Sequence, residues 1–210
     1  MPSDLINAIK TNQAAFGVDL ADDTIDRLSD YYDLIVESNP LLHLVAPSSA
    51  EEFAVRHILE ALTLLDQLPR GATLADVGTG AGLPSIPVLL AREDLRGMLI
   101  ESKAKKARFL EETITALGLA GRTRLFNAQF EEVDPAGCSF VTCRALDGFV
   151  EKLPRIVRWS KGRPLLLFGG PSLGEALRKQ GIPFDQRLTP MSNQRFLFRC
   201  AMRSGGAIIE

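Results

Sequence analysis

The sequence predicts an α/β protein with a mostly parallel sheet of seven strands, helices on both faces of the sheet and a helical extension at the N-terminal end. Two observations carry this prediction. From residue 72 onward, strand-like and helix-like segments alternate, which is the pattern of parallel strands joined by crossover helices. The first strand-like run is followed by the segment DVGTGAGLP at 76–84, a glycine turn typical of Rossmann-like sheets that bind nucleotides.

The extension is predicted to consist of helices. Apolar residues recur at helical spacing over 25–35, behind a predicted N-terminal cap at Asp22 or Asp23. A second apolar stripe extends over 54–68 and ends at a proline and a glycine. Prolines and serines interrupt the pattern between the two stripes, so residues 39–49 are predicted to form a loop.

The remaining chain alternates between strands and helices. The predicted strands cover 73–77, 97–101, 123–127, 139–143, 163–168, 184–188 and 195–202, and the predicted helices cover 84–92, 103–117, 149–160 and 172–180. Only residues 189–194 separate the last two strands, too few for a crossover helix, so these two strands are expected to pair antiparallel. The chain is therefore predicted to divide into a helical extension over 1–70 and a Rossmann-like domain over 71–210.

The composition of the 210 residues is that of an ordinary globular protein, with 46% hydrophobic and 24% charged residues. No apolar run approaches the roughly 18 residues of a membrane span, and the N-terminus lacks a signal-peptide pattern, so no membrane contact is expected. The three cysteines show no metal-type spacing and are expected to be reduced. We therefore expect a cytoplasmic, monomeric protein without a bound metal.

The net charge of −2 hides an asymmetry between the two ends of the chain. Residues 1–52 contain ten acidic and two basic side chains, whereas residues 140–209 contain twelve Lys and Arg and four acidic side chains. A basic C-terminal half indicates a surface for a polyanion. Solvated helix faces of opposite charge are the alternative explanation.

The glycine loop favours one nucleotide-like ligand over others. Gly78, Gly80 and Gly82 alternate with small residues, so the backbone can approach a ligand closely. Leu83 occupies the third glycine position of the dinucleotide fingerprint G-x-G-x-x-G, and no Gly-Lys-Ser/Thr of a P-loop follows. A G-x-G-x-G loop after an acidic strand end, here Asp76, resembles motif I of class I methyltransferases that use S-adenosyl-L-methionine (SAM).

Residues after three later strands fit the same cofactor. Glu101, about 20 residues beyond the loop, can accept hydrogen bonds from the ribose hydroxyls of an adenosine, or serve as an acid at a helix N-terminus. Phe130 and Glu131 follow the third strand, where a methyltransferase places an apolar side chain and an acid against adenine; a core residue and a surface charge are the alternatives. Arg144, after the fourth strand, could clamp the methionine carboxylate bidentately or form a surface ion pair.

Several motifs of other enzymes are absent. No Asn/Asp-Pro-Pro-Tyr/Phe follows the fourth strand, Cys143 lacks the preceding proline of a C5-pyrimidine methyltransferase, and there is no G-x-S-x-G elbow. The two histidines, His43 and His57, lie in no metal-binding pattern. Four cations open the helix at 103–108, where they oppose the helix dipole; this suggests phosphate contact, with a solvated helix end as the alternative.

Together these motifs resemble those of the RsmG (GidB) family. The resemblance rests on DVGTGAGLPSIP at 76–87, on ES and KKARFL within 101–110, on Phe-Glu-Glu at 130–132, on Cys-Arg-Ala at 143–145 and on Arg-His-Ile-Leu at 56–59. Members of this family are bacterial enzymes that methylate N7 of a guanine in small-subunit ribosomal RNA. The resemblance implies SAM contacts at Gly78, Leu83, Phe130, Glu131 and Arg144.

Three segments depart from the family pattern. The family's Asn-Leu-Thr near the N-terminus is His43-Leu44-Val45 here, its Asp-Ser after Arg-His-Ile-Leu is Glu60-Ala61, and its Lys-Gly after the fifth strand is Phe168-Gly169. All three lie on the predicted substrate side, whereas the cofactor motifs are intact. The sequence therefore supports the methyl donor more strongly than the particular acceptor.

The function predicted from the sequence is SAM-dependent methyl transfer to N7 of a guanine in 16S ribosomal RNA, with ribosomal RNA or the small ribosomal subunit as partner. N7 carries a free lone pair and needs no deprotonation before it attacks the methyl group, so catalysis would consist mainly of positioning, and no residue is predicted to be catalytic. A SAM-dependent methyltransferase of another RNA or of a small molecule is the first alternative. A non-catalytic nucleotide-binding module is the second.

Overall fold

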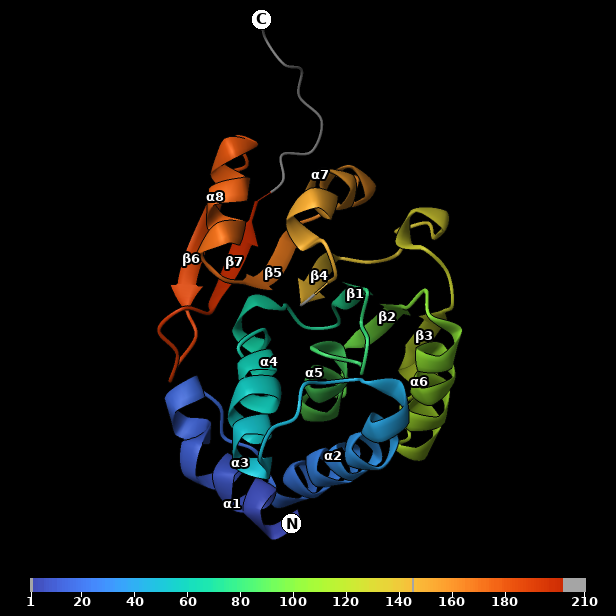
Figure 1. Cartoon of the computed structure of the whole chain (residues 1–210), viewed down its shortest axis with the longest axis vertical. Coiled ribbons are helices and arrows are strands. Elements are labelled where there is room, and N and C mark those ends of the chain that lie inside the picture. Colours follow the sequence, from blue (N-terminus) through green and yellow to red (C-terminus); the bar gives the residue numbers. More distant parts are fainter. Residues whose placement is uncertain (1, 145, 202–210) are drawn as a thin grey trace, which may run out of the picture.

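The structure is a computed structural model that describes residues 2–144 and 146–201. A seven-stranded sheet lies in the middle of the molecule, between two layers of helices (Figure 1). Its strands are β1 (Thr73–Val77), β2 (Arg96–Ile100), β3 (Thr123–Phe126), β4 (Phe140–Arg144), β5 (Leu165–Gly169), β6 (Phe184–Leu188) and β7 (Phe196–Cys200). Each strand begins and ends within about two residues of its predicted position, and residue 202, the predicted end of the last strand, lies outside the described residues.

The strand order is β3-β2-β1-β4-β5-β7-β6. The five strands from β3 to β5 pair in parallel, and β7 runs antiparallel between β5 and β6. The predicted fold class and the antiparallel pairing of the last two strands are therefore confirmed. The order of strands along the chain reverses between β1 and β4, and in such sheets a ligand crevice lies outside the carboxyl ends of the strands at that point.

The helices that follow the first strand also lie where the sequence predicts them. They are α5 (Ser85–Ala91), α6 (Ala104–Ala116), α7 (Phe149–Trp159) and α8 (Pro171–Lys179), with short 3-10 turns η4 (Ala120–Arg122) and η5 (Phe130–Glu132). Before the sheet come α1 (Pro2–Asn12), η1 (Gln13–Phe16), α2 (Asp22–Leu42), α3 (Ala50–Phe53), η2 (Ala54–Leu59), α4 (Glu60–Leu62) and η3 (Leu65–Gln67).

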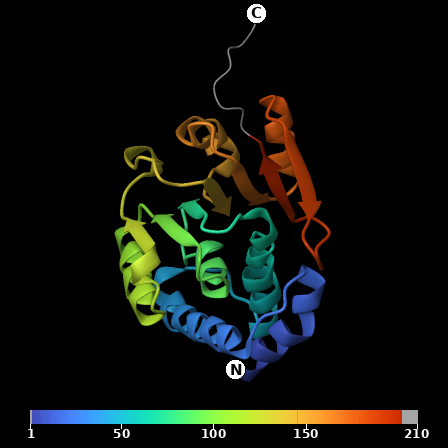
Figure 2. The ribbon, with the colours of Figure 1, turned by 180° about the vertical axis from the view of Figure 1, so that it is seen from behind.

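Each face of the sheet has its own hydrophobic core, because alternate residues of a strand point to opposite faces. On one face Leu74, Leu99 and Leu166 pack with α5, α6 and the N-terminal helices. On the other face, Val77 and Val141 pack with α7 and α8. Figure 2 shows the same arrangement of elements from behind. The N-terminal helices thus share a core with the sheet, and the division of the chain at residue 70 stays a prediction.

The predicted loop over 39–49 is wrong in its first part, because α2 continues through Pro40 to Leu42. The side-chain amide of Asn39 donates to the carbonyl oxygen of Val45, and its oxygen accepts from the amide of Val45, both at 3.0 Å. This local closure holds the last turn of the helix and offsets the one backbone hydrogen bond that Pro40 cannot donate.

Two predicted helix starts also differ in detail. The N-cap of α2 is Ala21, so the predicted cap at Asp22 or Asp23 is wrong; both carboxylates lie in the first turn, where they favour the helix dipole without capping an amide. Pro84, expected in the first turn after the glycine loop, occupies the N-cap of α5 and follows a cis peptide bond from Leu83.

The helix that precedes the sheet contains a π-helical segment, η2. At its end the amide of Glu60 donates to the carbonyl of Val55, five residues back. Such segments displace neighbouring carbonyls from the regular helical pattern and occur frequently beside functional sites. In this protein the carbonyl groups of Arg56 and His57 both accept hydrogen bonds from an arginine of β4.

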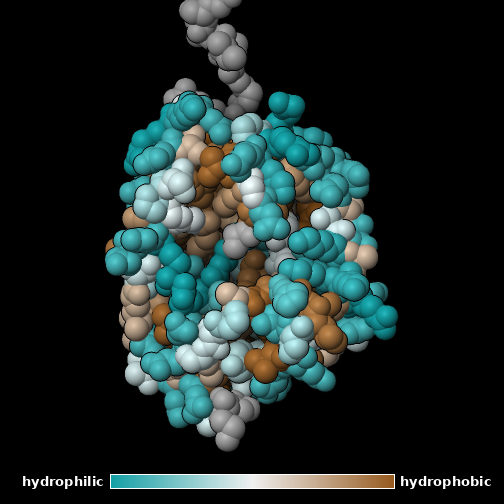
Figure 3. Space-filling model, viewed as in Figure 1, coloured by the Kyte–Doolittle hydropathy of each residue, from teal (hydrophilic) through white to brown (hydrophobic). Residues whose placement is uncertain are grey.

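Within the described residues, no helix is both long and apolar enough to cross a bilayer. The space-filling view shows mainly hydrophilic residues, with apolar residues in separate patches (Figure 3). Cys138, Cys143 and Cys200 are free and buried, which agrees with the expectation of reduced thiols.

Candidate active site

A cavity of about 370 Å³ opens at the carboxyl ends of β1, β2 and β4, and this size is typical of small-molecule sites. Its walls are the glycine loop, the residues that follow β2 and β4, the loop after α2, and η2. The lining residues are Leu44, Val45, Ala46, His57, Gly78, Thr79, Gly80, Ala81, Leu83, Glu101, Ser102, Lys103, Lys106, Arg144, Leu146, Asp147 and Lys152. Five of the seven predicted cofactor residues therefore line this one cavity: Gly78, Gly80, Leu83, Glu101 and Arg144.

The glycine loop is shaped by backbone that only glycine adopts readily. Gly78, Gly80 and Gly82 have φ values of 69°, 60° and 97°. The amides of Gly78 and Thr79 both donate to the carbonyl of Ile100, at 2.9 and 3.2 Å, which ties the loop to the end of β2. The loop therefore lies against the cavity in one defined shape.

Asp76, at the end of β1, holds the loop from beneath. Its Oδ2 accepts from the Thr79 hydroxyl at 2.7 Å and from the Ser85 amide at 3.3 Å. Its Oδ1 is buried and has no hydrogen-bond partner among the described residues. Burial raises the pKa of Asp76 from 3.8 to about 7, although hydrogen bonds from Thr79 and Ser85 act in the opposite direction.

Glu101 forms the floor of the cavity after β2. Its Oε2 accepts from the Gly80 amide at 3.0 Å and its Oε1 from the Lys103 amide at 2.8 Å, and the side chain is buried. Two backbone amides thus orient the carboxylate. Each of its oxygens keeps a further lone pair, so the group fits the ribose hydroxyls of an adenosine, as the sequence predicts.

A contact that the sequence did not reveal connects α2 to the loop. The hydroxyl of the fully buried Tyr31 donates to the carbonyl oxygen of Ala81 at 2.9 Å. Burial raises the pKa of Tyr31 well above its usual value, so the phenol keeps its proton and remains a donor. The two residues are 50 positions apart, and no local pattern links them.

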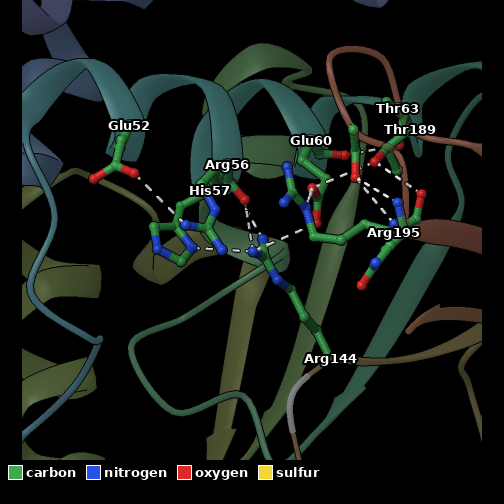
Figure 4. A network of polar contacts seen from close by, with 10 residues as sticks. Glu52, Arg56, His57, Glu60, Thr63, Arg144, Thr189 and Arg195 are labelled. Carbon is green, nitrogen blue, oxygen red and sulfur yellow. Dashed lines mark hydrogen bonds and ion pairs between the residues drawn. The ribbon is translucent and has the colours of Figure 1, made fainter. Parts of the chain in front are cut away.

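Arg144 extends from the end of β4 toward the π-helical segment (Figure 4). Its Nη2 donates to the carbonyl of Arg56 at 2.6 Å, its Nη1 to that of His57 at 3.5 Å, and its Nη2 lies 3.5 Å from an oxygen of Glu60. The guanidinium also lies over the ring of Phe168, 5.9 Å from the ring centroid. Arg144 therefore belongs to a buried network and its guanidinium borders the cavity, so the alternative of a surface ion pair is wrong.

Glu60 connects this network to the C-terminal hairpin. The carboxylate is buried and also pairs with Arg195 at 2.5 Å, and Thr189 donates to it at 3.5 Å (Figure 4). Glu60 and Phe168 are two of the positions that depart from the RsmG pattern, and both contact Arg144. These two departures from the family pattern therefore both lie beside Arg144.

His57 lines the cavity, a position that the sequence did not reveal. Its Nδ1 lies 3.0 Å from Nη2 of Arg144, and its ring packs against Phe53 with 4.9 Å between centroids. Burial, together with the charges of Arg144, Arg56 and Arg195, lowers the pKa of His57 from 6.5 to about 3. The imidazole is therefore neutral at neutral pH.

Phe130 and Glu131 do not line the cavity. Phe130 is buried in the core against Trp159, edge to face with 5.8 Å between centroids, and Glu131 forms an ion pair with Arg155. The guanidinium of Arg155 lies over the ring of Phe130, 5.8 Å from its centroid. Their predicted contacts with the adenine ring stay predictions.

The cavity rim carries several cations. Lys103, Lys106 and Lys152 line it, and Lys106 donates to the carbonyl of His43 at 3.2 Å across the loop after α2. Lys103 lies 3.6 Å from Asp147, an exposed pair that screening by water leaves weak. Part of the basic segment at 103–108 thus faces the site. No group of three or more metal-ligating side chains occurs in the described part of the chain.

The model of the family described as rRNA small subunit methyltransferase G (GidB) matches residues 24–172. A protein of Pelotomaculum thermopropionicum called ribosomal RNA small subunit methyltransferase G is 42% identical over 117 residues, 55% of this chain and 49% of that protein. The protein of the same name from Neisseria meningitidis is 34% identical over 152 residues, 72% of this chain and 71% of that protein. The matched region thus spans about half the length of the first relative and more than two thirds of the second.

Solved structures show the same fold at low sequence identity. A SAM-dependent methyltransferase from Aquifex aeolicus superposes with a TM-score of 0.54 at 17% identity, over 82% of this chain and 99% of that structure. This similarity supports the class I fold, while the family match reaches from α2 to the start of α8 and includes the glycine loop, Glu101 and Arg144. Ala145, the last residue of the Cys-Arg-Ala motif, lies outside the described residues. From the family model and the two relatives, the chain belongs to the rRNA small subunit methyltransferase G family.

Proposed function

We propose that this protein transfers the methyl group of SAM to N7 of a guanine in the RNA of the small ribosomal subunit. The observation that carries the proposal is the cavity at the switch in strand order. There a glycine loop and a fixed carboxylate, Glu101, form one wall and Arg144 forms part of another. Family membership supports the same reaction and the same acceptor.

The residues present fit SAM as the methyl donor. Glu101 would accept hydrogen bonds from the ribose hydroxyls, and the backbone of Gly78 and Gly80 would allow close approach of the cofactor. Leu83 offers an apolar surface, and Arg144 a cation for the methionine carboxylate, although its guanidinium also bonds to η2. The resemblance to the family adds Phe130 and Glu131 to the proposed SAM contacts. Neither residue lines the cavity, so their inclusion rests on that resemblance alone.

The proposed methyl transfer requires little acid or base catalysis. The N7 lone pair of guanine forms a bond to the methyl carbon while the bond from that carbon to the sulfonium sulfur breaks, and no proton has to leave N7 beforehand. The sulfonium supplies an activated methyl group. The chain's own contribution is to hold guanine in line with that group and to exclude water from the cavity.

The partner follows from the charge distribution as well as from the family. Lys103, Lys106 and Lys152 line the cavity, and cations of this kind bind RNA through phosphates without reading its sequence. We infer that ribosomal RNA approaches the cavity from this rim. We also retain from the sequence the expectation of a monomeric, cytoplasmic protein that does not contact membranes.

A second candidate function is SAM-dependent methylation of another RNA or of a small molecule. The observation that favours it is the altered surroundings of Arg144, where Glu60 and Phe168 stand in place of the family's residues. The two candidates share the cofactor and differ only in the acceptor, so an experiment that identifies the methylated atom separates them.

The test is methylation of purified small ribosomal subunits with tritiated SAM, using subunits from a strain that lacks the corresponding enzyme. We expect one N7-methylguanine per 16S RNA by mass mapping. Glu101→Ala should methylate about tenfold more slowly at low SAM concentration, because its SAM dissociation constant should rise at least roughly tenfold. Glu112→Ala, which removes an exposed carboxylate of α6, is the matched control and should behave like wild type. Methylation of a different atom or a different RNA would support the second candidate, and binding of NAD without SAM would rule out both.

A further inference from the structure

His57 has a fixed protonation pattern that the proposed reaction leaves unused. Its Nδ1 lies 3.0 Å from Nη2 of Arg144, and a guanidinium can only donate hydrogen bonds. Nδ1 must therefore be the acceptor, which places the proton of the neutral ring on Nε2. This nitrogen is the one hydrogen-bond donor that the imidazole can offer to a ligand.

The surroundings keep the ring neutral and in place. Three guanidinium groups act on it, from Arg56 on its own helix, from Arg144 at the end of β4 and from Arg195 at the C-terminal hairpin. The nearby carboxylates are engaged elsewhere, with Glu60 bound to two of these arginines and Glu52 lying 3.7 Å from Arg56 (Figure 4). Burial adds to the same effect, and the ring of Phe53 packs against the imidazole.

His57 lines the cavity beside Arg144. Glu101, after β2, is the proposed ribose contact and Arg144, at the end of β4, the proposed contact of the methionine carboxylate, so the sulfonium of a bound cofactor would lie between these two side chains. The acceptor base has to approach that sulfonium, and His57 is a polar side chain of this wall to which no cofactor contact is assigned. A neutral donor there suits a base whose reactive nitrogen must keep its lone pair free.

We propose that the Nε2–H of His57 donates to O6 of the acceptor guanine and thereby selects guanine over bases that carry an amino group at position 6. This inference rests on the proposed function. Guanine presents two acceptors, N7 and O6, on this edge, whereas adenine presents the N7 acceptor beside an amino donor. With adenine, the Nε2–H of His57 would face the 6-amino group, and two hydrogen-bond donors cannot pair with each other. Binding adenine would therefore leave a buried polar group without a partner, which disfavours that base.

The tautomer can be measured without any activity assay, because the chain has only two histidines. In His43→Gln protein, the single remaining imidazole can be observed by long-range nitrogen–proton correlation spectroscopy in ¹⁵N-labelled full-length chain. We expect the neutral tautomer with the proton on Nε2 and no titration between pH 5 and pH 8. A proton on Nδ1, or a midpoint inside that range, would overturn the inference while leaving the proposed function intact.

The selection is tested with subunits that carry guanine or 2,6-diaminopurine at the acceptor position. Wild type should prefer guanine by roughly 10- to 100-fold in kcat/KM, the discrimination expected of one good base-edge contact. His57→Gln can turn its amide to accept as well as donate and should reduce that ratio toward unity, whereas His57→Phe should lose most guanine methylation. Glu112→Ala, which removes an exposed carboxylate of α6, is the control and should keep the wild-type ratio.

The outcomes separate the two proposals. If wild type methylates guanine at N7 and the guanine preference of His57→Gln and His57→Phe is unchanged, the role of His57 is refuted and the proposed function stands. If wild type methylates no guanine although it binds SAM, both fail. SAM affinity within about threefold of wild type, measured by calorimetry, shows that the variants are folded and that the change concerns the acceptor.

Discussion

At the scale of single residues, Asp76 beneath the glycine loop makes the free energy of unfolding depend on pH. Its folded-state pKa is raised by burial to about 7, whereas in the unfolded chain it is near 3.8. Between these values the folded protein holds a proton that the unfolded chain has released, so this contribution to stability is complete at low pH and is lost as pH rises through 7. From pH 5 to pH 8, wild type should lose roughly 2 kcal/mol of unfolding free energy through this one group.

Asp76→Asn isolates that contribution. The amide oxygen can still accept from Thr79 and Ser85, but the group no longer titrates. Urea unfolding at pH 5 and pH 8, without SAM, should therefore give a smaller difference between the two pH values for the variant than for wild type. Equal differences in the two proteins would show that Asp76 keeps an ordinary pKa.

At the scale of elements, helix α2 supports the glycine loop through Tyr31. Tyr31→Phe removes the donor to the Ala81 carbonyl and leaves that acceptor buried, which should cost about 1–2 kcal/mol in unfolding free energy and raise the SAM dissociation constant several-fold. Tyr32→Phe is the matched control, because that ring packs on Phe53, with 4.9 Å between centroids. A Tyr31→Phe protein with unchanged stability and SAM affinity would contradict the role of α2.

The glycines of the loop differ in how much an added methyl group would disturb the surrounding atoms. A Cβ at Gly82 would lie 2.3 Å from a terminal carbon of Ile86, at φ 97°, whereas at Gly80 the nearest atom is a backbone oxygen 3.9 Å away. Gly80→Ala should then lose only the 1–2 kcal/mol or so of left-handed strain, and Gly82→Ala clearly more. Urea unfolding of the two variants checks this order, and a larger loss for Gly80→Ala would reverse it.

The elements were predictable from sequence to the extent that their signals are local. Alternating apolar residues and turn residues located every strand, and the spacing from the glycine loop to Glu101 located a true wall of the cavity. Partners remote in the chain have no such signal, so Tyr31 with Ala81 and Arg144 with the carbonyl groups of η2 could not be predicted. The extension of α2 past Pro40 was missed for the same reason, because the contacts of Asn39 with Val45 outweigh the local preference.

At the scale of the whole molecule, the uneven charge is arranged around the site. The N-terminal helices lie below the sheet in Figure 1 and α7 and α8 above it, so the acidic and basic ends of the chain occupy opposite ends of the molecule. The cations of α6 and α7 nearest the cavity, Lys106 and Lys152, belong to its wall. A polyanion drawn to Lys106 and Lys152 would therefore lie beside the cavity that these side chains line.

This arrangement predicts which cations contribute to RNA affinity. Each phosphate contact releases counterions, so removing one should make the plot of log K against log salt concentration shallower by about 0.7 to 0.9. Lys106→Ala on α6 and Lys152→Ala on α7 should each produce that change, whereas Lys10→Ala, a cation of α1 paired with Asp22 at 2.6 Å, should produce none. Titration of 16S RNA fragments at several salt concentrations measures the slopes. Equal slopes for all three variants and wild type would mean that Lys106 and Lys152 do not contact the phosphates of the RNA.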